Sequence, residues 1–436
     1  MKILIADKFE KSGLDGLKAL GCEVDWQPDL KDDTLVAAIA STKADVLVVR
    51  STKVKEPMLD AGQLTLIVRA GAGYDNIDVA GASARGVYVA NCPGKNSVAV
   101  AELAFGLILA LDRRIPDNVA ELRAGKWNKK EYSKADGIHG KTLGVLGFGN
   151  IGQEMARRAQ AFGMRLAIWS EIGVETDRSG MPLDMPLFVR LRPSAGYPID
   201  PFAQVCETPE EVAEKSDILS VHLALNDQTK KLVGANVFNK MRPGAYFVNT
   251  ARAGVVDYDA LAVAAKERNL RVALDVYASE PATPTGEFTD PLVQLPNVYG
   301  THHIGASTNQ AQEAIADEVV RIVKAYLETG RVPNVVNLAR QTPATHVLVV
   351  RHKDQPGVLA TVFDTLRDAK VNVQETENIV FADAKAAIAR INVDGEPGAD
   401  VIGRMRAANP GILDVTVVPL GAAFGSHQLA KSLSNW

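Results

Sequence analysis

The sequence has few cysteines, and no apolar run is long enough to cross a bilayer. Its three cysteines, Cys22, Cys92 and Cys206, are far apart and odd in number, so they form neither a disulfide framework nor a metal-ligand spacing. This pattern favours a reducing, cytoplasmic setting and indicates no metal site. The longest apolar stretch, from Val98 to Leu111, is interrupted by Glu102 and is too short for a membrane span. We expect it to form a long buried helix.

The chain also lacks an excess of positive charge. Its 48 Lys and Arg against 52 Asp and Glu give a net charge of -4. Proteins that bind nucleic acid or membrane surfaces usually carry a basic face, so neither partner is expected. A length of 436 residues exceeds what one hydrophobic core usually serves, and two or three domains are predicted.

Short apolar runs alternate with helical patterns as far as residue 336. The runs are KILIAD, VLVVRS, LIVRAGAG and GVYVANC, and then KTLGVLGFG, RLAIWS, ILSVHLAL, AYFVNTA and RVALDVY. Continuous apolar strands separated by helices are typical of parallel sheets that are covered on both faces. The fold class predicted is therefore α/β, with two doubly wound, Rossmann-like domains in series.

The pattern also predicts the domain boundaries. A helix over 309–329 is expected to return to the first unit, which makes the first domain discontinuous, with residues 1–95 and 300–336 around a nucleotide-binding domain at 96–299. The order β-α-β-β-α-β over 343–421 predicts a small ferredoxin-like module.

One stretch, residues 171–207, contains several prolines and fits no simple pattern. Structureless stretches of this length are uncommon and are usually functional or mobile. No role is predicted for this segment.

The hexapeptide GFGNIG follows the apolar strand 143–146 and opens a helix that is expected to end at Gly163. In such motifs the first glycine permits a tight turn, the second lets a pyrophosphate approach the backbone, and the third allows close helix–strand packing. The helix N-terminus then offers free N–H groups to the phosphates. The alternative is a tight turn without a ligand. The candidate cofactor contacts are Gly147, Gly149, Asn150, Ile151 and Gly152.

The strand after this helix ends without the expected acid. NAD sites usually place Asp or Glu about twenty residues further on, to bind the ribose hydroxyls. Here Ser170 occupies that position and Glu171 follows it. A serine is compatible with NADP, whose 2′-phosphate would need Arg178, but Glu171 would repel that phosphate. We therefore predict NAD, with NADP as the alternative.

Several motifs together resemble the D-isomer-specific 2-hydroxyacid dehydrogenase family. They are VVRSTKV, VRAGAGYDNID, NSVAVAEL, LGVLGFGNIG, NTARAGVVD, ALDVYASEP and HHIGAST. The C-terminal module, with HKDQPGVL, resembles the ACT module of the phosphoglycerate-oxidising members. The departures are Ser170 where the family has Asp, the long segment after it, Ala224 and Ala253 where Pro and Gly are common, and His302 where Pro is common.

The resemblance implies a catalytic set of Arg252, Glu280 and His303. Converting a 2-hydroxy acid into a 2-oxo acid moves a hydride and a proton. A histidine can exchange that proton, and a carboxylate beside it stabilises the imidazolium. A guanidinium can bind the substrate carboxylate with two hydrogen bonds. His303 rather than His302 is expected to be the base, because it directly precedes IGAST.

The resemblance also assigns further cofactor contacts, namely Leu223, Thr250, Ala251 and Asp275. Substrate binding is expected from the first domain, through Arg50, Ser51, Arg69, Ala72 and Gly73. The N–H groups of 71–73 can form an anion nest for a carboxylate, and two cations beside it favour a small, doubly anionic substrate. Surface salt bridges for the arginines and a turn-capping role for Asp275 are the alternatives.

The function implied is NAD-dependent oxidation of D-3-phosphoglycerate to 3-phosphohydroxypyruvate. An NADP(H)-dependent glyoxylate or hydroxypyruvate reductase is the alternative that Ser170 favours. A non-enzymatic sensor would be expected to lose the Arg–Glu–His set, which is intact. Family members build a dimer around 97–113, and ACT modules often pair, so a homodimer or homotetramer is expected. The candidate site for an amino-acid effector is His352, Asp354 and Asn372, with Asn372 predicted to lie beside the turn that holds Asp354.

Overall fold

The computed structural model describes residues 1–170, 203–281, 285–339 and 341–421. It separates into two compact units, Met1–Asn337 and Leu338–Trp436. The predicted residues Glu171 and Arg178 lie outside the described residues. The first unit contains two parallel sheets, as the apolar runs predicted.

The first sheet has five parallel strands in the order β2-β1-β3-β4-β5. The strands are β1 (Lys2–Ile5), β2 (Glu23–Trp26), β3 (Val46–Val49), β4 (Leu66–Arg69) and β5 (Tyr88–Asn91). The helices are α1 (Lys11–Ala19), α2 (Asp32–Thr42), α3 (Glu56–Asp60), α4 (Val79–Ala84) and α13 (Asn309–Thr329). One core lies between the sheet and α2, α3 and α4, and a second between the sheet, α1 and α13.

The helix α13 spans the residues that its sequence predicts. Ile315, Val319 and Ile322 on α13 are buried in one cluster with Ile3 and Leu17, far away in the sequence. The domain boundaries within this unit stay a prediction. The strand β2 was not predicted, because its sequence EVDW is short, half polar and only partly buried.

The second sheet has seven parallel strands in the order β12-β11-β10-β9-β6-β7-β8. The strands are β6 (Thr142–Leu146), β7 (Arg165–Trp169), β8 (Ala203–Val205), β9 (Ile218–Val221), β10 (Tyr246–Asn249), β11 (Arg271–Leu274) and β12 (Val298–Gly300). The helices α5 (Ser97–Arg113) and α8 (Asn150–Ala161) cover one face. The other face is covered by α10 (Pro209–Lys215), α11 (Ala235–Phe238) and α12 (Tyr258–Glu267). The three-residue strand β8 was not predicted.

The helix α5 is the buried helix expected from the apolar stretch, and ten of its residues are buried. Two short helices follow it, α6 (Ile115–Arg123) and α7 (Lys129–Tyr132), and a 3₁₀ turn, η1 (Ala253–Val255), follows β10. Neither α6 nor α7 buries a single residue, and the side chain of Trp127 between them is 82% exposed. Residues 115–132, which we call the α6–α7 arm, therefore expose apolar side chains.

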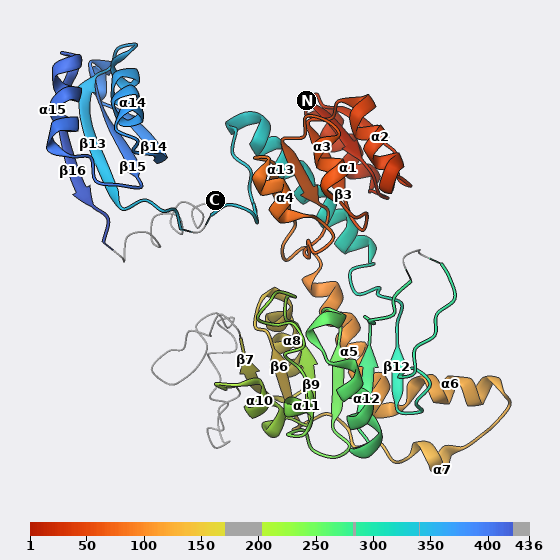
Figure 1. The fold of residues 1–436 in the computed structure, drawn as a ribbon. Coiled ribbons are helices and arrows are strands. Elements are labelled where there is room, and N and C mark those ends of the chain that lie inside the picture. Colours follow the sequence, from red (N-terminus) through yellow and green to blue (C-terminus); the bar gives the residue numbers. More distant parts are fainter. Residues whose placement is uncertain (171–202, 282–284, 340, 422–436) are drawn as a thin grey trace. The chain divides into compact units, whose positions relative to one another are not determined.

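The second unit holds a four-stranded antiparallel sheet in the order β14-β15-β13-β16. Its elements are β13 (His346–Lys353), α14 (Val358–Asp368), β14 (Val373–Val380), η2 (Ala382–Ala384), β15 (Ala386–Val393), α15 (Ala399–Ala408) and β16 (Ile412–Pro419). Both helices share one core with the sheet (Figure 1). This connectivity and strand order are those of a ferredoxin-like module.

Candidate functional site

The candidate catalytic and cofactor residues follow the strands of the second sheet directly. His303 comes after β12, Asp275 after β11, Arg252 after β10 and Leu223 after β9. Because all these strands are parallel, their carboxyl ends meet at one edge. The strand order reverses at β6, between β9 and β7, and such a switch point is where open α/β sheets bind their ligands.

The glycine loop between β6 and α8 has the geometry that a dinucleotide requires. Gly147 has a φ of +96°, and a Cβ there would lie 2.7 Å from the carbonyl oxygen of His222. A Cβ on Gly152 would collide with the Gly147 carbonyl, so this glycine permits close helix–strand packing. A Cβ on Gly149 would meet nothing within 4 Å, which leaves open space above the helix N-terminus. The loop therefore fits a pyrophosphate.

Other residues of this edge also fit a nicotinamide cofactor. The Thr250 hydroxyl is buried and has no hydrogen-bond partner among the described residues, and such an orphaned group is the kind that a polar ligand satisfies. Ala251, the next residue, and Leu223, which follows β9, are buried in one apolar cluster. Ser170 follows β7, whose last residue, Trp169, accepts a hydrogen bond from the Gly147 N–H at 2.8 Å. The adenosine end of the site would thus meet a serine.

His303 and Glu280 form a hydrogen-bonded pair. The distance from His303 Nδ1 to Glu280 Oε2 is 2.8 Å, and Glu280 Oε1 accepts from the Tyr277 N–H at 2.8 Å. Burial opposes ionisation of Glu280, but the hydrogen bonds from His303 and Tyr277 and the charge of Arg252 hold its pKa below the usual value. An ionised Glu280 accepts a hydrogen bond from the Nδ1–H of His303, which leaves Nε2 as the nitrogen that can exchange a proton with a substrate. The pairing supports the choice of His303 over His302.

Arg252 reaches from the second sheet to the loop that follows β4. Its Nε donates to Asp75 Oδ1 at 3.1 Å, and its Nη1 donates to the Ala251 carbonyl at 2.9 Å. A Cβ on Gly73 would collide with Nη2 of Arg252, so the absence of a side chain there makes room for the guanidinium. Asp75 is also partly buried, which favours its neutral form, but the charge of Arg252 lowers its pKa overall.

Arg69 lies against the same loop. A Cβ on Gly71 would collide with Nη1 of Arg69. Burial, followed by the neighbouring charge of Arg252, lowers the pKa of Arg69 to about 10, and Arg50 contributes in the same direction. Nε of Arg69 is buried without a partner among the described residues. Two close cations and an unsatisfied donor make this a site for an anion.

Two details of the substrate side differ from the sequence-based expectation. The N–H of Gly71 donates to the Arg69 carbonyl at 2.8 Å, so the predicted nest is limited to Ala72 and Gly73. The Ser51 hydroxyl donates to Asp7 at 3.0 Å. Asp7 also accepts from the N–H groups of residues 50–52, so its carboxylate fixes the loop that carries Arg50.

Asp275 is buried and bonds to the loop that carries His303. Its carboxylate accepts from the Thr301 hydroxyl at 2.6 Å and from the N–H groups of Ile304 and Gly305, each at 2.8 Å. These contacts support the alternative role, in which Asp275 orders a turn. A contact between Asp275 and the nicotinamide stays a prediction.

The structure does not bring the three candidate effector residues together within one module. His352 is buried, with Nε2 3.0 Å from Asn378 Oδ1. Asp354 follows the last residue of β13, which pairs with the first residue of the antiparallel β15. The backbone N–H of Asn372 donates to Asp394, which follows the last residue of β15, so Asn372 lies at the opposite edge of the sheet. The prediction that Asn372 lies beside the Asp354 turn is therefore wrong for a single module.

Sequence analysis missed two acidic residues of the site, Asp75 and Asp7. Asp75 stands inside the motif VRAGAGYDNID, and a carboxylate within reach of two predicted arginines was the available signal. Asp7 ends the first apolar run, at the same carboxyl edge as Arg50. Both contribute negative charge that orders the arginine-bearing loops.

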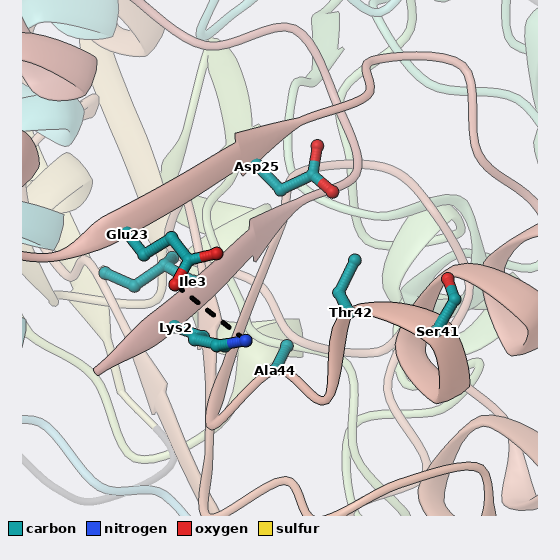
Figure 2. A pocket seen from close by; sticks show the side chains of 7 residues that line it. All are labelled: Lys2, Ile3, Glu23, Asp25, Ser41, Thr42 and Ala44. Carbon is teal, nitrogen blue, oxygen red and sulfur yellow. Dashed lines mark ion pairs between the residues drawn. The ribbon is translucent and has the colours of Figure 1, made fainter.

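A separate hollow lies at the opposite, amino edge of the first sheet (Figure 2). Lys2 and Glu23 form an ion pair across it at 3.8 Å. Its volume of about 220 Å³ is below the usual range for ligand sites, and it contains none of the predicted residues.

Comparison with known proteins agrees with this arrangement. The family model described as D-isomer specific 2-hydroxyacid dehydrogenase, catalytic domain, matches residues 3–337. A D-3-phosphoglycerate dehydrogenase of Methanocaldococcus jannaschii is 36% identical over 78% of this chain, which spans 60% of that relative's length. A hydroxypyruvate reductase of Thermotoga maritima is 40% identical over 69% of this chain and 89% of its own length. In the described part of the chain, no helix combines the length and apolarity needed to cross a membrane.

Solved structures match the same region. An NAD⁺-bound 3-phosphoglycerate dehydrogenase of Entamoeba histolytica is 25% identical, with a TM-score of 0.61 over 78% of this chain and 99% of the other. An NADPH-dependent glyoxylate/hydroxypyruvate reductase of Sinorhizobium meliloti, in complex with NADP and malonate, is 28% identical, with a TM-score of 0.62 over 77% and 96%. The chain belongs to the D-isomer specific 2-hydroxyacid dehydrogenase family.

Proposed function

We propose that this chain oxidises D-3-phosphoglycerate to 3-phosphohydroxypyruvate with NAD, the first step of serine biosynthesis. The observation that carries this proposal is the place of Arg252. Its Nε donates to Asp75 in the loop after β4, its Nη2 packs against Gly73, and Arg69 packs against Gly71 of the same loop. The charge of Arg252 is also one of the smaller contributions that lower the pKa of Glu280, the partner of His303. One guanidinium is thus close to both the acid–base pair and a second cation. A substrate with an anion at each end matches that spacing of charges.

The chain's own residues would divide the work as follows. Arg252 binds the substrate carboxylate and polarises the oxygen at C2. Arg69, helped by Arg50, binds the phosphate, which satisfies the buried Nε donor. Ala72 and Gly73 donate backbone N–H groups to the carboxylate.

His303 would transfer the proton. Its Nε2 accepts the proton of the C2 hydroxyl while the C2–H bond gives up a hydride, which leaves a ketone at C2. Glu280 stabilises the imidazolium that forms and holds the ring by its 2.8 Å contact with Nδ1. Nicotinamide, when bound, supplies the hydride acceptor.

The cofactor would be held along the carboxyl edge of the second sheet. Its pyrophosphate would bind at Gly147, Gly149 and the start of α8, and its adenosine ribose at Ser170 with Glu171. Leu223, Thr250 and Ala251 would contact the nicotinamide half. NAD is proposed because Glu171 would repel the 2′-phosphate of NADP.

The direct test is an assay of the purified protein with NAD and NADP against a panel of 2-hydroxy and 2-oxo acids. The highest kcat/KM is expected for D-3-phosphoglycerate and 3-phosphohydroxypyruvate with NAD(H). Higher values with acids that lack a phosphate would contradict the proposed substrate.

The alternative is an NADP(H)-dependent glyoxylate or hydroxypyruvate reductase. Ser170 in place of an acid favours it, as does the hydroxypyruvate reductase relative, most of whose length this chain matches. In the same panel this function would give its highest kcat/KM for glyoxylate or hydroxypyruvate with NADPH.

The second unit is proposed to be an ACT module that assembles the protein or binds an amino-acid effector such as serine. Its edge strand β14 is exposed, and Ile379 and Val380 on it are each 47% exposed. The arm formed by α6 and α7 is a further candidate contact between subunits, because Leu122 and Trp127 are exposed on it. A homodimer or homotetramer is expected from these two surfaces.

A further inference from the structure

The segment that leads out of the first unit lies along the edge strand of the first sheet. Val335 forms an antiparallel bridge with Ala90 in β5, and Asn337 Oδ1 accepts from the Val89 N–H at 2.9 Å. The first compact unit ends at Asn337. Residues 334–337, through which the chain leaves the first unit and which we call the exit segment, are therefore hydrogen-bonded to β5.

Asn334 connects this segment to the end of β5. Its side-chain amide donates one proton to the Asn91 carbonyl at 3.2 Å and the other to Glu318 Oε1 at 2.7 Å. Both amide protons are therefore used. The φ of Asn334 is +57°, in the left-handed region that asparagine tolerates better than most residues.

Glu318 anchors this contact from α13. It is almost fully buried and binds Arg321 in bidentate fashion, with Nη2–Oε1 and Nε–Oε2 distances of 2.6 and 3.0 Å. Lys95 lies 3.2 Å away, in the segment that crosses to the second sheet. Burial opposes ionisation, but hydrogen bonds from Arg321, Lys95 and Asn334 together lower the pKa of Glu318 to about 2. Asn334 thus binds a fixed, charged acceptor.

Asn91 carries the connection to the substrate loop. Its side chain is largely buried, and Nδ2 donates to the Ala72 carbonyl at 2.6 Å. The next residue, Cys92, donates its N–H to the Gly71 carbonyl at 2.9 Å. Two consecutive residues of the β5 end therefore fix two consecutive carbonyls of the loop against which Arg69 and Arg252 pack.

We propose that Asn91 and Asn334 are positioning residues for substrate binding, and that they couple the exit segment of the chain to the substrate loop. Asn334 holds the β5 end, Asn91 holds the Ala72 carbonyl, and the loop in turn sets the places of the two guanidiniums. A change in the path of the chain after Asn334 is thereby transmitted to the anion site. The proposal rests on the proposed function for the identity of that site.

The test replaces Asn334 with glycine in the full chain. Asn334→Gly keeps a backbone that tolerates positive φ but removes the amide. The matched control is Asn269→Gly, because Asn269 also has a positive φ, +53°, in the exposed turn between α12 and β11. Asn334→Gly loses both amide hydrogen bonds, and the one to Asn91 is the one that acts on the loop. Its loss predicts a KM for the 2-hydroxy acid raised about three- to tenfold, with kcat and the KM for NAD near their parent values. Asn269→Gly should leave all three unchanged.

Hydrogen exchange of the peptide that covers residues 70–76 gives a readout that does not need activity. Asn334→Gly should speed its exchange about three- to tenfold, and Asn269→Gly should not. Asn91→Asp keeps the size of the side chain but loses the N–H donor to the Ala72 carbonyl. The variant that combines Asn91→Asp with Asn334→Gly should therefore show no higher KM and no faster exchange than Asn91→Asp alone. If Asn334→Gly matches Asn269→Gly in both KM and exchange, the coupling is wrong. If the parent enzyme oxidises none of the 2-hydroxy acids, the proposed function fails, and the exchange result alone decides the coupling.

Discussion

The parallel sheets of the first unit and the antiparallel sheet of the second place their loops differently. In the first unit, a side chain that directly follows a strand lies at one shared edge, so Arg252 and His303 are neighbours of the same site. In the second unit, the crossover helix α14 returns the chain to the edge where β13 began. Asp354 and Asn372 therefore lie at opposite edges, although the sequence separates them by only one helix.

The largest effects are expected from the residues that the parallel edge brings together. His303→Ala and Arg252→Ala should each lower kcat/KM by roughly 10²-fold or more, because acid–base and positioning contributions are of that size. Initial rates with a saturating cofactor measure this, and circular dichroism checks the fold. His302→Ala is the matched control and should be mild. A larger loss in His302→Ala would show that the wrong histidine was chosen.

A second prediction separates the two ends of the substrate. Arg69→Ala should raise the KM for 3-phosphoglycerate by roughly 10- to 100-fold, since hydrogen bonds to charged groups contribute about 1.5–3 kcal/mol. D-Lactate, which has the carboxylate but no phosphate, serves as the control substrate, and its KM should change little. Equal changes for both acids would place Arg69 at the carboxylate instead.

These predictions could be made from sequence because the first unit combines strong local signals with a simple geometry. The strands of its two sheets that were predicted are buried apolar runs, and the glycine loop has its usual spacing. The contacts of Asp75 and Asp7 were missed because the residues around a carboxylate do not specify which group it binds across the sheet. For Asp75, the two predicted arginines were a signal that such a contact would form. For Asp275 a turn-capping role was predicted only as an alternative, and its partners in residues 301–305 were not identified for the same reason. β2 and β8 were missed because short, half-polar strands carry little periodicity.

The cofactor preference is expected to respond more modestly. Ser170→Asp should increase the ratio of kcat/KM with NAD to that with NADP by about tenfold, because a carboxylate would bind the ribose hydroxyls and repel a 2′-phosphate. Ser170→Ala is the control and should change this ratio little. A parent enzyme that prefers NADP(H) would instead indicate a phosphate partner such as Arg178.

Removal of the second unit tests whether the antiparallel module has a role of its own. A chain that ends at Asn337 keeps the edge contact with β5 but loses the exposed strand β14. We expect a smaller assembly by light scattering, with residual activity, and loss of any inhibition by L-serine. If neither the size nor the response to serine changes, the module is not the assembly or effector unit proposed.

The smallest effect concerns stability, and it compares a buried ion network with an exposed one. Glu318 in the first unit is almost fully buried, and its pKa is lowered from 4.5 to about 2. In the second unit, burial opposes ionisation of Asp414, but Arg351 and Arg406 lower its pKa overall. A carboxylate whose pKa is lowered by folding stabilises the folded state when the pH is above the pKa of the unfolded chain. This contribution is lost as the pH falls through the pKa of the folded protein.

Glu318→Gln should therefore lower the thermal midpoint at neutral pH, with a difference from the parent that shrinks between pH 4.5 and pH 2. Tryptophan fluorescence is a suitable probe, because three of the four tryptophans, Trp26, Trp127 and Trp169, belong to the first unit. Asp414→Asn is the control and should leave this midpoint unchanged, since exposed ion pairs contribute little. A difference that persists undiminished at low pH would mean that Glu318 acts through packing and not through its charge.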